Sequence, residues 1–241
     1  MDLIGANINN LTNLWKIGGR LAGQYIEEKG YCLSIAESGD WPNKLWVNNP
    51  LDRQVLADIP NSYINKLALP VWGNDLSKQE LVLKTYGFDE ELTQVAMSIK
   101  LQDTTAHMER IVIQKVTDEQ MAKIWSQLFQ EAFGYRISAD TVKKTMRNIE
   151  YFIGRDNKVP VGTAMLFIDK YQIAGIHSMG IIPSQRRKGY AQELLVHMLN
   201  IASAKGAKHA ILQASKMGKR LYLKAGFQED FTIKTFIKHE N

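Results

Sequence analysis

The chain has 241 residues, of which 45% are hydrophobic and 23% are charged, and its formal net charge is +5. This length allows one large domain or two small ones, and the apolar fraction is typical of a packed core, which excludes disordered and fibrous proteins. The longest apolar stretch, 161–168, is much shorter than the roughly 20 residues of a membrane-spanning helix.

The amino terminus and the cysteine content give two further expectations. Residues 1–4 lack the basic and apolar regions of a secretory signal. Cys32 is the only cysteine, so it can form no internal disulfide and no cysteine-based metal site, and the histidines and carboxylates lack metal-ligand spacing. We therefore expect a soluble cytoplasmic protein that binds no metal and does not enter a membrane.

Charge divides the chain into two parts. Residues 1–105 hold 9 Lys and Arg against 13 Asp and Glu, a net charge of −4, whereas residues 106–241 hold 21 against 12, a net charge of +9. The asymmetry favours an anionic partner of the second part, such as a phosphorylated cofactor, a nucleic acid or a membrane surface, and composition alone does not choose among them. Docking of an acidic half on a basic half would produce the same asymmetry.

Hydrophobic periodicity and turn residues predict the elements of the first part. The first helix is expected over 11–29, although Gly18, Gly19 and Gly23 weaken it. The other elements are a helix over 76–86 and strands over 31–36, 44–47, 67–72 and 93–101. A polar break at 103–105 follows, and we expect the domain boundary there.

The second part alternates strands and helices. Asp118 and Ser138 are positioned as N-caps of its first two helices. The helices are expected over 119–133, 139–148, 189–205 and 218–224, and the strands over 110–116, 150–154, 160–169, 173–182, 209–214 and 231–238. This pattern predicts a mixed α/β fold whose sheet is covered on both faces.

A short internal repeat connects the two parts. Gly-Phe-Asp-Glu-Glu-Leu-Thr at 87–93 parallels Gly-Phe-Gln-Glu-Asp-Phe-Thr at 226–232, and a Leu-Lys pair precedes each run. In both copies a glycine stops a helix, and an acidic turn leads into an alternating strand. The repeat favours a common origin of the two parts over chance.

The most informative segment is 181–191. A strand ends at Ile182-Pro183, a basic loop follows, and a helix begins at Gly189. A helix start leaves about four backbone N–H groups unpaired and carries a partial positive charge, so it suits a pyrophosphate. A solvated basic loop before an amphipathic helix would have the same composition, so the segment alone is a weak motif.

Two motifs of the second part resemble those of one family. Arg186-x-x-Gly189-x-Ala191 is similar to the Arg/Gln-x-x-Gly-x-Gly/Ala signature of the GNAT superfamily, the acetyl-CoA-dependent N-acyltransferases. Leu-Tyr-Leu-Lys-Ala-Gly-Phe at 221–227 resembles the Leu-Tyr-x-Lys-x-Gly-Phe stretch of that family. The resemblance covers roughly residues 110–241 and implies a GNAT-like acyltransferase fold for a domain over 106–241.

The resemblance also implies a site for acetyl-CoA as cosubstrate. The residues implied to hold its pyrophosphate, mainly through backbone amides, are Arg186, Arg187, Lys188, Gly189, Tyr190 and Ala191. Backbone groups of Met179 and Ile181 are implied to pair with the pantetheine arm, and the N–H of Ile181 to polarise the acetyl carbonyl. Ser215 stands where the family often has the asparagine that binds pantetheine.

Tyr222 is implied to be the general acid that protonates the leaving thiolate. A tyrosine hydroxyl, with a reference pKa of about 10, protonates a thiol of reference pKa about 8.5 only with help from geometry and from the charge of the transition state. The alternative is that Tyr222 only packs beneath the cofactor.

The general base is open at this stage. His177 lies four residues before Ile181, and period-two alternation predicts that it shares a face with Met179 and Ile181, directed at the acetyl group. An imidazole there could accept the ammonium proton directly or through water. A histidine satisfied within the core is equally consistent with the sequence, and Glu150 is a further candidate.

The first part resembles the family only through the Gly-Phe repeat. It lacks the pyrophosphate loop, and Val82 stands at the position that matches Tyr222 when Lys84 is aligned with Lys224. Residues 1–105 are therefore interpreted as a degenerate copy that binds no cofactor, in a tandem arrangement with 106–241. Four tryptophans of this part are candidates either for the lining of a substrate cleft or for the core: Trp15, Trp41, Trp46 and Trp72.

The sequence thus predicts an N-acetyltransferase that moves the acetyl group of acetyl-CoA directly to a primary amine of an unidentified acceptor. The alternative is an acyl-CoA-binding sensor or regulator without activity. Binding of nucleic acid through the basic part ranks last, because the sequence has no helix-turn-helix or aromatic stacking pattern. The acceptor and the oligomeric state do not follow from the sequence.

Overall fold

The computed structural model of the chain describes residues 2–48, 51–101 and 109–238. The domain boundary expected near residue 105 lies outside these ranges. The helices are α1 (Leu3–Ala22), α2 (Arg53–Asp58), α3 (Asn61–Ile64), α4 (Ser77–Thr85), α5 (Glu119–Phe133), α6 (Ala139–Thr145), α7 (Tyr190–Ala204) and α8 (Lys219–Lys224), with a short 3₁₀ helix at Pro183–Gln185. The strands are β1 (Gly23–Glu27), β2 (Tyr31–Ala36), β3 (Lys44–Val47), β4 (Leu69–Gly73), β5 (Phe88–Lys100), β6 (Val112–Lys115), β7 (Glu150–Asp156), β8 (Val159–Ile168), β9 (Ile173–Ile181), β10 (His209–Ser215) and β11 (Gln228–Lys238).

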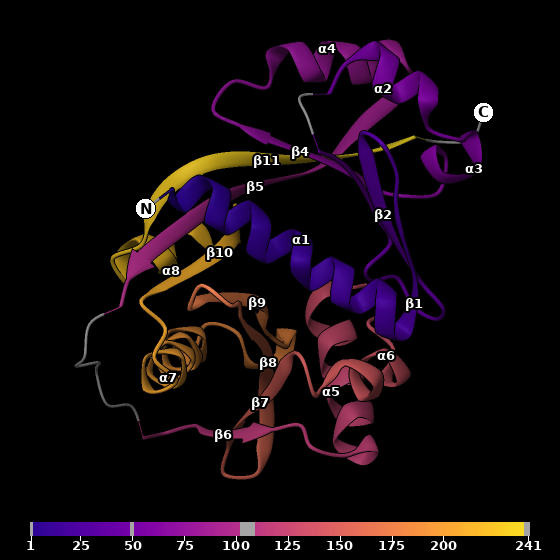
Figure 1. The fold of residues 1–241 in the computed structure, drawn as a ribbon. Helices are drawn as coiled ribbons and strands as arrows, with labels where there is room; N and C mark the ends of the chain where they lie inside the picture. Colours follow the sequence, from indigo (N-terminus) through magenta and orange to yellow (C-terminus); the bar gives the residue numbers. More distant parts are fainter. Residues whose placement is uncertain (1, 49–50, 102–108, 239–241) are drawn as a thin grey trace.

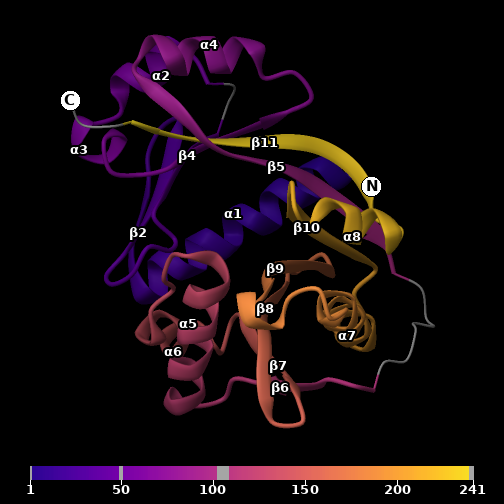
Figure 2. The same cartoon turned by 180° about the vertical axis from the view of Figure 1, so that it is seen from behind.

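Strands from both parts of the chain form one large sheet. Its order is β4-β11-β5-β10-β9-β8-β7-β6, and β1, β2 and β3 form a separate antiparallel sheet. Only the pairing of β10 with β9 is parallel in the large sheet. Helix α1 crosses the middle of the molecule in both views (Figures 1 and 2). The predicted α/β class with a mixed sheet is confirmed.

The first helix differs from the prediction. It begins at Leu3, where the side chain of Asp2 accepts a hydrogen bond of 2.9 Å from the N–H of Gly5, and it ends at Ala22. Residues 23–27, predicted as its last turns, form β1 and pair with β2. The prediction was wrong because the polar residues of the first two turns hid the helix, whereas tertiary contacts bury Asn7 and Asn10 completely.

Three apolar clusters define the layers. Helices α1, α5 and α6 pack on one face of the large sheet, and α7 and α8 pack on the opposite face of its carboxy-terminal strands. A third cluster joins α2, α3 and α4 to β2, β3, β4 and the far ends of β5 and β11. Figure 1 shows α2 and α4 above β4, β5 and β11, and α7 and α8 to the left of β7, β8 and β9. Strands of both halves thus form one sheet, and α1 packs on the same face of it as α5 and α6.

The centre of the sheet has approximate twofold symmetry. Exchange of the two halves leaves the order β4-β11-β5-β10 unchanged, since β4 corresponds to β10 and β5 to β11. In the β5–β11 pairing, Ser98 lies opposite Gln228, and the residues 139 positions away, Ile237 and Asp89, also lie opposite each other. The shift of 139 is also the distance between the repeated Gly-Phe pairs at 87 and 226. Gln94 and Ile233, which are partners and also counterparts, lie at the axis.

Even the irregularities of these two strands correspond. Asp230 is an extra residue of β11 between the pairs of Glu229 and Phe231, and Glu91, its counterpart 139 positions earlier, is an extra residue of β5. Each half contains, in order, a helix, three strands, a helix, a strand, a helix and a strand, with α3 added in the first half and β6, α6 and a 3₁₀ helix added in the second. The two halves therefore have matching architectures.

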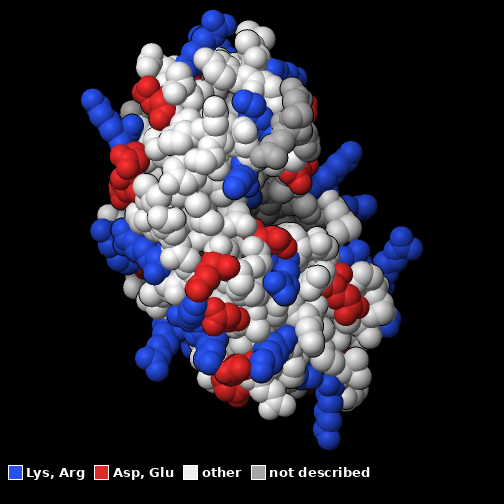
Figure 3. Space-filling model, turned by 90° about the vertical axis from the view of Figure 1, so that its right-hand side faces the viewer, with Lys and Arg blue, Asp and Glu red and all other residues white. Residues whose placement is uncertain are grey.

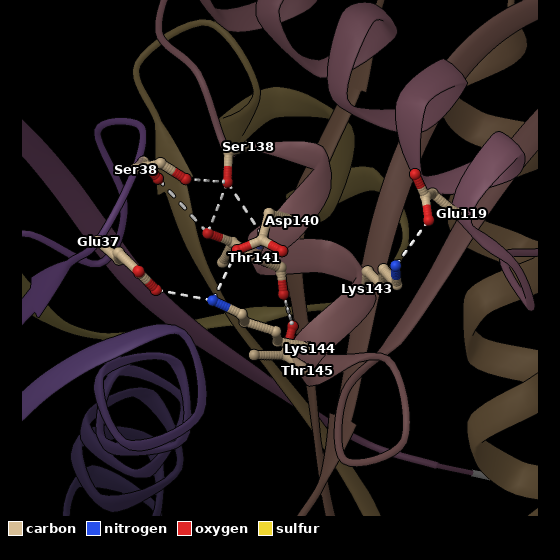
Figure 4. Close-up of polar contacts among 9 residues, drawn as sticks. All are labelled: Glu37, Ser38, Glu119, Ser138, Asp140, Thr141, Lys143, Lys144 and Thr145. Carbon is tan, nitrogen blue, oxygen red and sulfur yellow. Dashed lines mark hydrogen bonds and ion pairs between the residues drawn. The ribbon is translucent and has the colours of Figure 1, made fainter.

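Polar contacts between the segment after β2 and helix α6 join the two halves (Figure 4). The hydroxyl of Ser38, after β2, donates to Ser138, the N-cap of α6, over 2.9 Å. The ammonium of Lys144 on α6 lies 2.7 Å from a carboxylate oxygen of Glu37 and 2.8 Å from one of Asp140. Loop segments, as well as the shared sheet, therefore hold the first half on the second.

Candidate active site

The loop between β9 and α7 presents free backbone donors. None of the N–H groups from Arg187 to Ala191 donates to a described residue. Arg187, with φ of 62°, and Gly189, with φ of 86°, both have left-handed backbone conformations, which direct successive amides toward one concave surface. No side chain caps α7. A start of a long helix with free amides suits a pyrophosphate.

Arg110 and Asp156, which the sequence analysis did not single out, hold the outside of this loop. Arg110 donates from Nη2 to the carbonyl oxygen of Lys188 over 2.7 Å, forms an ion pair with Glu193, and lies 4.3 Å above the ring of Tyr190. The hydroxyl of Tyr190 donates to Asp156 over 2.6 Å. The side chain of Tyr190 is thus used within the protein, and its backbone remains for a ligand.

The side chain of Arg186 donates hydrogen bonds to two backbone carbonyl oxygens within the protein. Its Nε donates to the carbonyl oxygen of Ile181 over 3.0 Å, and its Nη2 donates to that of Ala132 over 2.9 Å. The guanidinium therefore ties the end of β9 to the end of α5. The side chains of Arg187 and Lys188 are exposed beside the loop and supply positive charge there.

A β-bulge changes the direction of side chains along β9. Ser178, with φ of 49°, and Met179 lie opposite the single residue Ala164 of β8. His177 therefore contacts α1, whereas Met179 and Ile181 pack in the cluster beneath α7. The prediction that His177 shares a face with Met179 and Ile181 is wrong, because alternation is lost where an extra residue enters a strand.

The bulge leaves backbone groups of β9 directed away from β8. Ile182 donates to Val161 over 3.1 Å, so the neighbouring pair, Ile181 and Gly162, exchanges no hydrogen bonds. The N–H of Ile181 consequently points away from β8, toward the side of β10.

Strand β10 does not pair with this part of β9. Its parallel pairing with β9 spans three residue pairs and ends at Ile211 and Gly175. Beyond that point the two strands separate, which defines a split between parallel strands. An extended chain that carries acceptors could pair with the open edge of β9 in this split.

Four polar residues occupy the α1 side of the split and form the amide network: Asn7, Asn10, His177 and Gln213. His177 lies 3.2 Å from Oδ1 of Asn10 through Nε2 and 3.1 Å from Oε1 of Gln213 through Nδ1. Gln213 donates from Nε2 to Oδ1 of Asn7 over 2.7 Å. The first half of the chain therefore contributes two of the four members.

Backbone carbonyls fix the orientation of the network. Asn10 donates from Nδ2 to the carbonyl oxygens of Phe167 and Ile173, and Asn7 donates to that of Met97. The oxygens of Asn10 and Gln213 then face the imidazole. Glycine at 175 is required, because a Cβ there would lie 2.1 Å from Oδ1 of Asn10 and 2.2 Å from Nε2 of His177.

The environment of His177 favours the neutral imidazole. Burial lowers its pKa to about 4, and the contact with Gln213 offsets part of that effect. A neutral imidazole has one N–H group and cannot donate to both amide oxygens, whereas a protonated one can. His177 is therefore a weak base whose protonated form has two hydrogen-bond acceptors in place.

Tyr222 lies on the opposite face of the sheet from His177. Its ring packs edge-on against Phe227 at 5.8 Å, within the cluster that contains Met179 and Ile181. Burial raises its pKa to about 12, and its hydroxyl bonds to no described residue. Ser215, at the end of β10, accepts a hydrogen bond of 3.2 Å from the N–H of Gly218, which occupies one lone pair of its hydroxyl.

The other sequence candidates have structural contacts. Glu150 pairs with Lys115 and Lys205. Among the four tryptophans, Trp15, Trp41 and Trp46 are buried and Trp72 is half-buried. The sequence analysis missed Arg110, Asn7, Asn10 and Gln213. No motif marks them, although two asparagines in a buried helix are a signal of polar partners elsewhere in the chain.

The face shown in Figure 3 carries basic and acidic side chains interspersed over its lower part. This distribution differs from the single-sign patch that binds nucleic acid. No helix in residues 2–48, 51–101 and 109–238 is long and apolar enough to cross a membrane.

Residues 118–227 match the model of the acetyltransferase (GNAT) family. This confirms the resemblance drawn from the two motifs.

The whole chain has relatives of known structure. A GCN5-related N-acetyltransferase from Kribbella flavida has a TM-score of 0.70 and 14% identity, with 96% of each chain covered. A GCN5-related N-acetyltransferase from Sphaerobacter thermophilus has a TM-score of 0.61 and 15% identity, with 86% of this chain and 80% of that one covered. A protein of unknown function from Staphylococcus epidermidis has a TM-score of 0.64 and 16% identity, with 89% and 93% covered. These similarities show a shared fold over both halves. No curated protein sequence matches significantly.

Proposed function

We propose that the protein transfers the acetyl group of acetyl-CoA directly to a primary amine, and that the second half carries the reaction. The observation that carries this proposal is the set of unused donors: the amides of 187–191 at the start of α7 and the N–H of Ile181 in the split. The amides can bind a pyrophosphate, and the split can admit an arm that pairs with β9.

In the proposed reaction the amine nitrogen forms a bond to the acetyl carbon, and the bond from that carbon to sulfur breaks. The N–H of Ile181 stabilises the negative charge that develops on the carbonyl oxygen. The sulfur receives the proton of Tyr222, whose raised pKa keeps the hydroxyl protonated at neutral pH.

The amine must lose a proton. We propose His177 as its acceptor: because Asn10 and Gln213 contact both ring nitrogens, one contact opens to admit the proton and the other stabilises the imidazolium. Its pKa of about 4 makes it a weak base and keeps it neutral, as this role requires, before the amine binds.

We also propose that residues 1–105 are a degenerate copy of the catalytic half. Their matching architecture and the shared register of β5 and β11 support this assignment. The first half lacks an arginine-glycine loop of the type at 186–191. The full chain should therefore bind one acetyl-CoA.

The decisive experiment measures the release of free CoA from acetyl-CoA with a panel of primary amines, together with the stoichiometry of acetyl-CoA binding by calorimetry. Amine-dependent release and one site per chain are expected. Binding without release at any amine would identify an acyl-CoA sensor instead. Two sites of similar affinity would contradict the degenerate copy.

A further inference from the structure

The first half contains a split that corresponds to the one in the second half. Lys44 of β3 forms a parallel bridge with Ala68, just before β4, and the N–H of Leu45 donates to the carbonyl oxygen of Ala68 over 3.0 Å. Beyond this bridge β3 and β4 separate, as β9 and β10 do beyond Gly175. The matching architecture places the two splits at equivalent positions.

The split of the first half holds a cavity of about 430 Å³. Residues of β3, β4 and α1 line it, and Gln79 of α4 contributes. In the second half, His177 and Gln213 close the same side of the split by contact with α1. Ligand pockets commonly have volumes of about 300–1,000 Å³, so the cavity has room for a small molecule.

The lining of the cavity favours a ligand with a negative charge. Lys16 is the cation among the described lining residues, and these include no aspartate or glutamate. Lys16 makes no close ion pair with a described residue, and its Nζ lies 5.6 Å from the ring centre of Tyr25. Its charge acts at longer range on the exposed carboxylate of Glu27, whose pKa is lowered by the hydrogen bond from Tyr25 and by the charge of Lys16. An anionic group would therefore gain a partner at this end of the cavity.

The remaining lining favours a ligand that has hydrogen-bonding groups and a flat apolar body. The side-chain NH₂ groups of Asn9, Asn48 and Gln79 donate to no described residue, so the cavity offers hydrogen-bond donors to a ligand. Trp46 and Trp72 contribute indole surface from adjacent strands. Aromatic side chains favour planar partners.

We infer that the split of the first half is a binding site for a small anionic molecule with a planar apolar body, bearing a carboxylate or a phosphate. The anion lies at Lys16, and the planar body lies beside Trp72. The site binds its ligand independently of the transfer reaction, so its failure leaves the proposed function untouched.

The test uses calorimetry on the full chain with 2-naphthoate, 1-naphthyl phosphate and uncharged 2-naphthol. We expect at least one anion to bind with a Kd of about 1 mM or lower and 2-naphthol to bind at least fivefold more weakly. Tighter binding of one anion identifies the headgroup. Lys16→Gln should weaken the binding of the anion about fivefold or more, and Trp72→Leu should also weaken it, with thermal unfolding confirming that each variant folds.

Arg20→Gln is the matched control. Arg20 lies one turn beyond Lys16 on the same helix and also faces Tyr25, but it does not line this cavity. Binding should change less than twofold in this variant and should persist with saturating acetyl-CoA. Equal binding of 2-naphthol, equal binding by the Lys16 variant, displacement by acetyl-CoA, or no binding of either anion would each overturn the inference.

Discussion

The two halves share one architecture, but their splits have different contents. In the second half the amide network closes the α1 side of the split, and free donors of β9 and of the following loop remain on the other side. In the first half the corresponding split is an open cavity beside Trp72, and the sequence after β3 has no Arg/Gln-x-x-Gly-x-Gly/Ala motif. A duplicated scaffold can therefore keep its sheet while only one copy keeps the groups that transfer chemistry requires.

The largest expected effect is on the rate of transfer and concerns Tyr222 of α8, where helix α4 of the first half has Val82. Tyr222→Phe removes the hydroxyl and keeps the ring against Phe227. Because general acid–base catalysis typically contributes about 10²- to 10⁴-fold, kcat should fall at least 100-fold when thiolate departure limits the rate, with acetyl-CoA affinity nearly unchanged. Single-turnover kinetics measures this. Val82→Leu, at the matching position of the first half, is the control, and near-normal kcat in the Tyr222 variant would show that solvent protonates the thiolate.

The amide network should produce an acid-dependent loss of stability. The folded pKa of His177, about 4, lies below the unfolded value of about 6.5, so the folded state binds fewer protons between these values. The contribution is complete above pH 6.5 and is lost as the pH falls toward 4, by about 2 to 3 kcal/mol. Urea unfolding at pH 7 and pH 4.5 should show this loss in the wild type and its reduction in His177→Gln.

His209→Gln provides the control for that measurement. The pKa of His209 is lowered by partial burial and by the nearby Lys100, and the side chain lies outside the amide network. This variant should retain most of the acid dependence. An identical pH profile in the wild type and in the His177 variant would show that the network accommodates the imidazolium without cost.

The loop at 186–191 should give the second half, and not the first, its affinity for acetyl-CoA. Gly189→Val puts a β-branched residue at φ of 86° and brings its Cβ to 3.3 Å from Arg110 Nη2. Acetyl-CoA affinity should fall at least tenfold, about 1.4 kcal/mol. Gly206→Val imposes similar backbone strain, at φ of 84°, beyond the other end of α7 and should leave affinity unchanged. Calorimetry that finds equal affinities for both variants would remove the loop from the cofactor site.

The smallest effect concerns the joint between the halves. Ser138→Ala removes the N-cap of α6 and the contact with Ser38, and the free energy of unfolding should fall by about 1 kcal/mol. Lys144→Gln removes exposed ion pairs and should leave unfolding almost unchanged, because surface ion pairs contribute little. Urea unfolding compares the two. A larger loss in the Lys144 variant would mean that charge holds the halves together.

Local patterns in the sequence determined most of the second half. Strong periodicity and the N-caps Asp118 and Ser138 located α5 and α6, and the two motifs located the loop and Tyr222. The repeat at Gly87 and Gly226 pointed to the symmetry of the sheet. These features depend on neighbours within a few residues, which is why the sequence alone reveals them.

Long-range contacts decided the rest. The helix at Leu3 was hidden because Asn7 and Asn10 have their partners on β5, β8, β9 and β10, more than eighty residues away. The face of His177 depends on one extra residue at Ser178, which alternation along a strand cannot reveal. The cavity of the first half exists only because β3 and β4 part after a single bridge, a consequence of how the whole sheet pairs and not of any local pattern.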